Sequence, residues 1–273
     1  MRFYFSILTL LVIIGLSSCK KDQTTLVQAR MQIHFSHKVD GEPLVEDQMI
    51  YTNAAGNVYE VTEVMYFISD LKLYRSDGTV VEPATWNDIQ YVDTKISSTF
   101  TWNLPGDIPD GSYDSITFVF GISEEKNKIG LFTNPPEVNM AWPDVLGGGF
   151  HYLMLNGWWL DPDNVRQSYN FHLGIGQIYE NNSGQVKDII GFVQNYFLVR
   201  PDGQGFEVED GMLIEAELTM HIENWFKNPH VYDHNQWGGA IMQNQDAMQM
   251  GCENGHDVFT VEYTLHPHHF ALE

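Results

Sequence analysis

A regular alternation of apolar and polar residues constrains this chain more than any other feature of its sequence. The clearest case is the stretch 211–222, in which every second residue is apolar and the residues between them are mostly charged or polar. Because successive side chains of a β-strand point to opposite faces, this pattern predicts a strand with one face in a core and the other in water. Similar stretches occupy residues 31–39, 61–75, 88–93, 111–120, 150–155, 168–174 and 188–199.

Helical patterns are few, and Gly, Pro, Asn and Asp separate the strand-like stretches. We expect short helical turns at residues 124–130 and 223–226 and a helix at 240–251. The sequence therefore predicts an all-β fold, an antiparallel β-sandwich with short helices in the connections. Residues 30–273 contain no internal repeat, and we expect them to form a single domain.

The first 29 residues have the pattern of a lipoprotein leader. Residues 1–18 combine an early Arg2, an apolar run and two small residues, as a signal peptide does. The following Cys19 completes a sequence that resembles a bacterial lipobox, so we predict that Cys19 is the lipid anchor and that residues 19–29 include a polar tether. No other run is long enough to span a membrane. We expect a cell-envelope protein, anchored by lipid alone to the outer membrane, on its periplasmic face or at the cell surface.

Charge and cysteine content narrow the possible partners. The chain has 36 acidic and 14 basic side chains, a formal net charge of −22. Nucleic acid is therefore excluded as an expected partner, because phosphate backbones are bound by neutralising them with Lys and Arg. Besides Cys19 there is one cysteine, Cys252, so the domain has no intrachain disulfide.

Enzyme signatures are missing, whereas potential copper ligands are plentiful. The chain has no P-loop, no dinucleotide-binding fingerprint, no nucleophile elbow and no zinc-binding helix motif, and we expect no enzymatic activity. It does have 11 His and 11 Met. Imidazole nitrogen and thioether sulfur, without thiolates, favour copper.

Strand periodicity separates three histidines from the others. His37 and His151 are in phase with the apolar residues of their stretches, so each must find a hydrogen-bond partner or a metal ion. A satisfied core histidine is the alternative for each of them. His172 is out of phase with its apolar neighbours, and it either lines a cleft or meets water.

Tryptophans form a second cluster around three glycines. Trp142 precedes the segment Gly147-Gly148-Gly149, and Trp158 and Trp159 follow it. These rings either pack in the core, stack on sugar rings, or stand beside a metal ion where an indole can be oxidised.

Five segments agree in order and spacing with a known family. They are IHFSHKVDG (33–41), VTEVMYFIS followed by LKL (61–73), MAWPD through GGGFHY (140–152), YNFHLG (169–174), and WFKNP through NGHDVF (225–259). Together they resemble the MbnP-like copper-binding domain of lipoproteins from Bacteroidetes-type bacteria, from about residue 30 to about residue 262.

This resemblance implies a copper-binding β-sandwich with a role in copper capture, storage or handover. It carries His37, His151 and His172 over as candidate copper ligands, with Met140 or water completing the set, and Trp142 as a candidate for oxidation to kynurenine. It also implies a di-haem peroxidase of the MauG type as a partner. The alternative is a surface lipoprotein that binds glycans or proteins through Trp142, Trp158 and Trp159.

Overall fold

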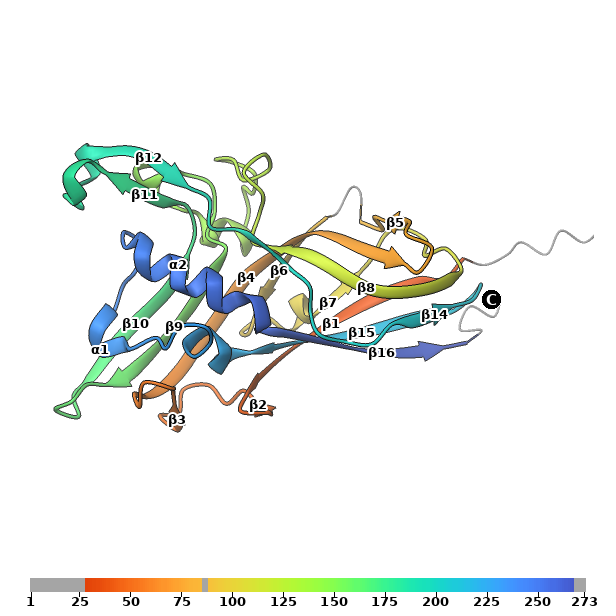
Figure 1. Ribbon diagram of the computed structural model, residues 1–273, viewed down its shortest axis with the longest axis horizontal. Coiled ribbons are helices and arrows are strands. Elements are labelled where there is room, and N and C mark those ends of the chain that lie inside the picture. The colour runs from red at the N-terminus through yellow and green to blue at the C-terminus, as the bar shows by residue number, and fades with distance from the viewer. Residues whose placement is uncertain (1–27, 85–87, 268–273) are drawn as a thin grey trace, which may run out of the picture.

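Two β-sheets and a separate two-stranded hairpin make up the chain, as a computed structural model shows for residues 28–84 and 88–267 (Figure 1). The described residues are therefore mostly strands, as predicted. The strands are β1 (Arg30–Val39), β2 (Glu42–Pro43), β3 (Tyr51–Thr52), β4 (Val58–Arg75), β5 (Val80–Val81), β6 (Ile89–Asp93), β7 (Thr101–Asn103), β8 (Gly111–Phe120), β9 (Leu153–Leu160), β10 (Arg166–Leu173), β11 (Gly176–Tyr179), β12 (Ile189–Val193), β13 (Phe197–Val199), β14 (Phe206–Val208), β15 (Leu213–His221) and β16 (Phe259–His266).

The first sheet has the order β16-β15-β1-β2, and β7 also pairs with β1. The alternation in β1 appears as buried and less buried residues in turn, and in β15 it holds from Ile214 to Leu218. One pairing differs from the antiparallel prediction, because β1 and β15 run parallel over the length of both strands. β1 is the first strand and β15 the last but one, so a long crossover joins them, as a parallel pair requires.

The second sheet is built around the long strand β4. Its order is β10-β9-β4-β8-β13, with β14 on β8 and with β3, β5 and β6 on β4. Every pairing in this sheet is antiparallel. The hairpin of β11 and β12 forms the third, separate sheet.

Aromatic side chains join the inner faces of the two large sheets. Phe35 of β1 meets Tyr66 of β4 with ring centroids 6.3 Å apart, and Phe259 of β16 meets Phe118 of β8 at 5.3 Å. These rings belong to one continuous core of buried apolar residues. The β-sandwich is thus confirmed, since the sheets share one core between their inner faces.

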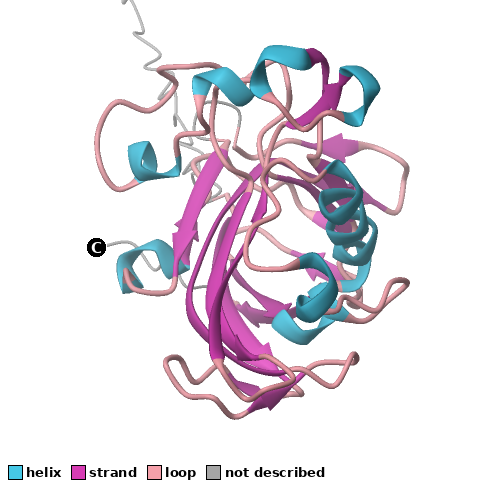
Figure 2. Cartoon of the chain, turned by 90° about the vertical axis from the view of Figure 1, so that its left-hand side faces the viewer, coloured by secondary structure: helices cyan, strands magenta, loops and turns pink. Residues whose placement is uncertain are grey.

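The helices are short and lie around the outside of the strands (Figure 2). The longest, α2, packs against β10 and β11. No helix in the two described ranges is long and apolar enough to cross a membrane. The helices are η1 (Ser97–Phe100), η2 (Glu137–Met140), η3 (Asp144–Leu146), η4 (Glu180–Asn182), η5 (Val186–Asp188), η6 (Ile222–Phe226), α1 (His234–Trp237), α2 (Gln245–Asn254) and η7 (Gly255–Asp257), all 3₁₀ except α1 and α2.

Several boundaries differ from those expected. Residues 188–199 form two strands in different sheets, because β12 pairs with β11 whereas β13 pairs with β8. The strand expected at 150–155 runs from 153 to 160, and the helix expected at 240–251 begins at 245. Residues 124–130 form turns instead of a helix, and β16 had no predicted counterpart. Periodicity over a few residues does not reveal which partner strand a segment will find.

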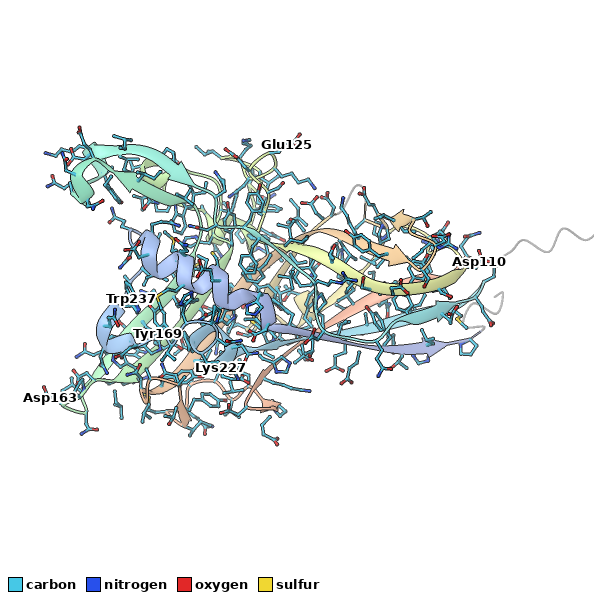
Figure 3. The ribbon with its side chains drawn as sticks, viewed as in Figure 1. Asp110, Glu125, Asp163, Tyr169, Lys227 and Trp237 are labelled. Carbon is cyan, nitrogen blue, oxygen red and sulfur yellow. The ribbon has the colours of Figure 1, made fainter. Side chains whose placement is uncertain are left out.

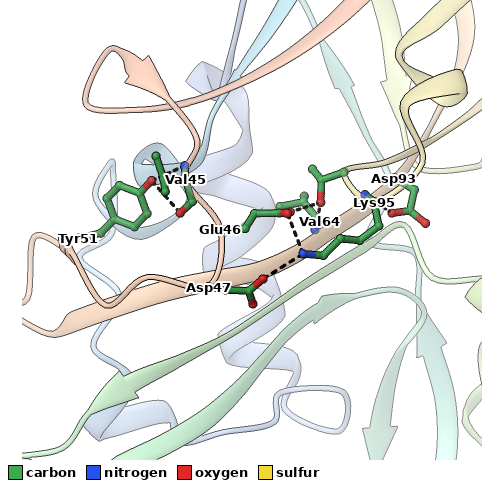
Figure 4. A network of polar contacts seen from close by, with 8 residues as sticks. Val45, Glu46, Asp47, Tyr51, Val64, Asp93 and Lys95 are labelled. Carbon is green, nitrogen blue, oxygen red and sulfur yellow. Dashed lines mark hydrogen bonds and ion pairs between the residues drawn. The ribbon is translucent and has the colours of Figure 1, made fainter.

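A polar network fastens residues 45–47 against the middle of β4 (Figure 4). Lys95 forms ion pairs with Glu46 at 2.8 Å and with Asp47 at 3.3 Å. The Thr94 hydroxyl accepts the Val64 N–H at 3.0 Å. The network therefore holds the charged side chains of Glu46, Asp47 and Lys95 beside the middle of β4.

Candidate metal centre

A closed loop brings residue 151 to the beginning of β9. The N–H of His151 donates to the carbonyl of Met140, and the N–H of Trp142 donates to the carbonyl of Gly149. Ala141 and Phe150 form an antiparallel bridge between these bonds. The loop therefore returns on itself like a hairpin, and Trp142 and His151 lie on its two arms.

The three consecutive glycines allow this loop to close. Gly147, Gly148 and Gly149 have φ of +122°, +69° and +80°, which other residues rarely adopt. At Gly149 a Cβ would lie 2.6 Å from Oδ1 of Asn127, which accepts the N–H of Phe150. A larger residue would displace the contact that holds the arm just before His151.

One nitrogen of His151 is hydrogen-bonded and the other is free. Nδ1 lies 2.9 Å from the carbonyl oxygen of Met140, which can only accept, so neutral His151 carries its proton on Nδ1. Nε2 is buried and has no hydrogen-bond partner among the described residues. Burial lowers the pKa of His151 to about 4, although its hydrogen bond to the Met140 carbonyl opposes this shift, so the imidazole is neutral at pH 7.

His172, near the end of β10, has the complementary arrangement. Its Nε2 lies 2.8 Å from Oδ1 of Asn156, while its buried Nδ1 has no partner in the described part of the chain. Burial, and then the neighbouring His151, lower the pKa of His172 to about 3. Both histidines are therefore neutral at pH 7, the form that binds metal ions.

The two imidazoles are in direct contact. Their ring centroids are 5.1 Å apart with an interplanar angle of 87°, and the indole of Trp142 meets His151 at 4.6 Å. Two imidazoles that bind one ion through metal–nitrogen bonds of ~2.0 Å have centroids roughly 5–6 Å apart. The spacing of the pair therefore suits a shared ion.

Two methionines that were not candidates from the sequence lie in one row with His172 across β10, β9 and β4. Met154 of β9 is directly opposite His172 on one side and Met65 of β4 on the other. Residues directly opposite in antiparallel strands have their side chains on one face of the sheet. Alternation shows only that Met154 is out of phase with His151, and strand register is needed to show which residues lie opposite it.

The other residues predicted for the site either lie away from the His151–His172 pair or contact it through the main chain. His37, on β1 of the other sheet, is buried as predicted, but its ring contacts Tyr66 and Phe100, and its Nε2 lies 3.2 Å from the Tyr66 hydroxyl. Met140 reaches His151 through its main-chain carbonyl. Cys19 lies outside the described residues. The structure thus brings together two of the three predicted histidines.

The free nitrogens of the two histidines are suited to bind a metal ion. No group of three or more His, Cys, Asp and Glu is placed to hold a metal ion in residues 28–84 and 88–267. A two-imidazole site must therefore draw on thioether or water. Buried nitrogens without partners are costly, and each histidine of the pair leaves one lone pair buried and unused. A metal ion with a preference for imidazole and thioether fits this donor set.

The tryptophans do not form an exposed stacking platform, in contrast to the alternative considered above. Trp142 is 1% exposed and Trp159 is 6% exposed. The guanidinium of Arg166 lies 4.4 Å from the ring centroid of Trp158. Two of the three rings are therefore inaccessible to a sugar, and an arginine covers the third.

A further buried histidine is not among the candidate ligands chosen from the sequence. His234, at the start of α1, is 0% exposed, and both of its ring nitrogens lack partners in the described structure. Its ring stacks on Tyr169 at 4.5 Å and on Trp159 at 5.6 Å (Tyr169 is labelled in Figure 3). Burial lowers its pKa to about 4. The rings around His234, which we call the aromatic cage, belong to Tyr59, Trp159, Tyr169, Phe226 and Tyr232.

Comparison with known proteins agrees with the fold and with the resemblance seen in the sequence. A solved structure titled "MbnP from Methylosinus trichosporium" aligns with a TM-score of 0.55 at 13% identity, covering 86% of this chain and 98% of that chain. No curated protein matches the sequence. The family model named MbnP matches residues 28–243, which include Met65, His151, Met154 and His172. The chain therefore belongs to the MbnP family.

Proposed function

We propose that this protein binds copper as cargo, through His151 Nε2, His172 Nδ1 and the thioether of Met154. The observation that carries the proposal is the pair of neutral, touching imidazoles, each with one nitrogen hydrogen-bonded and the other buried without a partner among the described residues. A histidine that binds a metal ion usually donates its second ring N–H to a neighbouring oxygen, and each of these two has one ring nitrogen beside an oxygen, the Met140 carbonyl for His151 and Asn156 Oδ1 for His172. Membership of the MbnP family supports the choice of copper.

The neighbouring methionines favour Cu(I) over Zn(II). Thioether sulfur is a soft ligand that selects Cu(I), whereas zinc sites use thiolate, imidazole and carboxylate. Met154 and Met65 lie in the row of His172, and Met65 is itself buried. The site has no evident catalytic base among the described residues, so capture, storage or handover of the ion fits its chemistry better than turnover.

The proposal places the protein in the cell envelope. Cys19 then anchors the mature chain to the outer membrane by lipid, and the net charge of −22 raises the local concentration of cations. A Cys19→Ser variant tests the anchor, because it should lose label in cells fed a radioactive fatty acid and move to the soluble fraction. Retention of label by the variant would exclude Cys19 as the site of acylation.

The partner that the family resemblance implies is a di-haem peroxidase of the MauG type. Trp142 is the candidate for its oxidation, because the indole is in ring contact with His151. Peptide mass spectrometry of Trp142 after incubation with such a peroxidase and peroxide tests this step. An unmodified Trp142 would remove it from the proposal.

Metal analysis of residues 20–273 tests copper binding directly. The protein is incubated with Cu(I), Cu(II) or Zn(II) and desalted, alongside His151→Ala/His172→Ala and, as a matched control, His37→Ala. We expect nearly one Cu(I) per chain in the unmodified protein and in the His37 variant, and none in the double variant. Copper that survives in the double variant would disprove the ligand assignment.

A further inference from the structure

His172 has two ring nitrogens, and only the nitrogen without a proton can bind a metal ion. In the neutral ring, the partner of one nitrogen decides which nitrogen carries the proton. Nε2 of His172 faces Oδ1 of Asn156 at 2.8 Å, and Nδ1 has no partner in the described chain. The orientation of the Asn156 amide therefore decides whether Nδ1 offers a lone pair or a proton.

An amide can turn either its oxygen or its NH₂ group toward a neighbour, so a second contact must fix Asn156. Glu63 of β4 is directly opposite Asn156 of β9 in the antiparallel pair. Burial is the main cause that raises the pKa of Glu63, and a polar contact with the Asn156 side chain opposes this rise. In the structure the Asn156 oxygen faces His172, so the NH₂ group is the part of the amide left to donate to the carboxylate oxygens of Glu63.

We propose that Glu63 and Asn156 form a hydrogen-bonded relay that holds the proton of His172 on Nε2 and leaves Nδ1 free to bind the cargo ion. Glu63 and Asn156 are positioning residues, since they act through His172. Their role in metal binding rests on the proposed function, whereas their effect on the proton of His172 holds in the metal-free protein.

Charges around Glu63 come from the network that fastens residues 45–47 to β4. Burial and the carboxylates of Asp93 and Glu46 raise the pKa of Glu63, and Lys95 opposes them. Lys95 also forms an ion pair with Glu46 (Figure 4). Lys95 therefore counteracts part of the rise in the pKa of Glu63, the carboxylate at which the relay begins.

The proton position can be observed directly in the metal-free protein. Long-range ¹H–¹⁵N correlation spectra of histidine-labelled residues 20–273 distinguish an imidazole protonated on Nε2 from one protonated on Nδ1. We expect the Nε2–H form for His172 and the Nδ1–H form for His151. A His172 ring protonated on Nδ1 in the unmodified protein would overturn the proposal.

Substitution of Asn156 tests the effect on metal binding. Asn156→Leu should lower the affinity for Cu(I) ~10–100-fold, the usual effect of removing a group that orients a ligand histidine. The matched control is Asn170→Leu, because Asn170 is exposed and lies directly opposite Asn156 on the same face. Equal affinities of the two variants would overturn the proposal.

Exchanging the two functional groups separates a relay from a general packing effect. In Glu63→Gln/Asn156→Asp, the amide introduced at position 63 donates to the carboxylate introduced at position 156, which accepts from His172. We expect Asn156→Asp alone to weaken Cu(I) binding through repulsion with Glu63, and the double exchange to restore both the affinity and the Nε2–H signal. Failure of the folded double variant to restore them would overturn the relay. An unmodified protein that binds no copper disproves the proposed function, and the ¹⁵N spectra still decide the proton position.

Discussion

The β9–β10 hairpin has two different buried histidine environments at its two ends. At the open end, His151 and His172 each have one nitrogen hydrogen-bonded and one nitrogen free of any partner among the described residues. Toward the turn, Trp159 and Tyr169 of the same hairpin stack on His234, whose nitrogens are both without partners in the described structure. Burial alone therefore does not identify a metal ligand. An imidazole suited to bind metal has its second nitrogen fixed, and that bond sets both the tautomer and the ring orientation.

Replacing one histidine of each environment by phenylalanine should give the largest difference in Cu(I) affinity. His172→Phe removes a proposed ligand and should lower Cu(I) affinity by at least ~100-fold, because only one imidazole and a thioether of the proposed set remain. His234→Phe should leave Cu(I) affinity unchanged, since the aromatic cage offers no second ligand. Competition with a chromophoric Cu(I) chelator measures both affinities. A large loss in His234→Phe would refute the distinction between the two environments.

Substitutions in the loop that positions His151 should affect the protein nearly as much as substitutions of the proposed ligands. Gly149→Ala introduces a Cβ at φ +80° that lies 2.6 Å from Asn127 Oδ1, and we expect a loss of about 1–3 kcal/mol in unfolding free energy together with weaker copper binding. Gly184→Ala is the control, because Gly184 has a φ of +66° and a Cβ added there would meet nothing within 4 Å. Urea unfolding measures both variants. Equal losses would show that backbone strain alone, without the Asn127 contact, explains the effect.

Removal of His234 should stabilise the fold. His234→Phe replaces two buried nitrogens, which lack partners among the described residues, by carbon in a site already lined by aromatic rings, and each such nitrogen costs about 1–3 kcal/mol. We expect the unfolding free energy to rise by about 1–3 kcal/mol at pH 7. His172→Phe, which also breaks the bond to Asn156, should give no such gain. A destabilised His234→Phe would indicate that the imidazole has a polar partner in solution.

Acidification should reduce the stability of the unmodified protein more than that of His234→Phe. The pKa of His234 is about 4 in the folded protein and 6.5 in an unfolded chain, so between these values the unfolded chain binds the additional proton. Stability therefore falls as the pH decreases from 6.5 toward 4, by up to about 1.4 kcal/mol per pH unit from this histidine. Urea unfolding at pH 7, 6 and 5 should show a shallower dependence for His234→Phe. Parallel curves would contradict the lowered pKa.

Much of the fold was predictable because strands have a short, regular period. The alternation in residues 31–39 and 211–222 identified β1 and β15, and the inward phase of His37 and His151 was confirmed by their burial. The parallel pairing of these two strands was not predictable, because alternation defines the faces of a strand but not its neighbours. The division of 188–199 between two sheets escaped prediction for the same reason.

The candidate site was predictable only in part. The sequence contained His151, His172 and Trp142 as candidates, and the structure places these three rings in successive contact. It did not indicate Met154, Asn156 or Glu63, because their relation to His172 depends on the register of β4, β9 and β10. It also did not separate His37 from the pair, since all three imidazoles are buried but belong to different sheets.

By itself, the sequence determined most of the long strands and their faces, the excess of negative charge and the supply of imidazole and thioether ligands, since these follow from residue type and local periodicity. Only the tertiary structure decided which two histidines meet, which of their nitrogens remain free and which amide and carboxylate lie behind them. The physical reason is that hydrogen bonds and metal coordination require atoms within a few ångströms of one another. In a β-sandwich, strand order and register bring such atoms together from segments that are far apart in the chain.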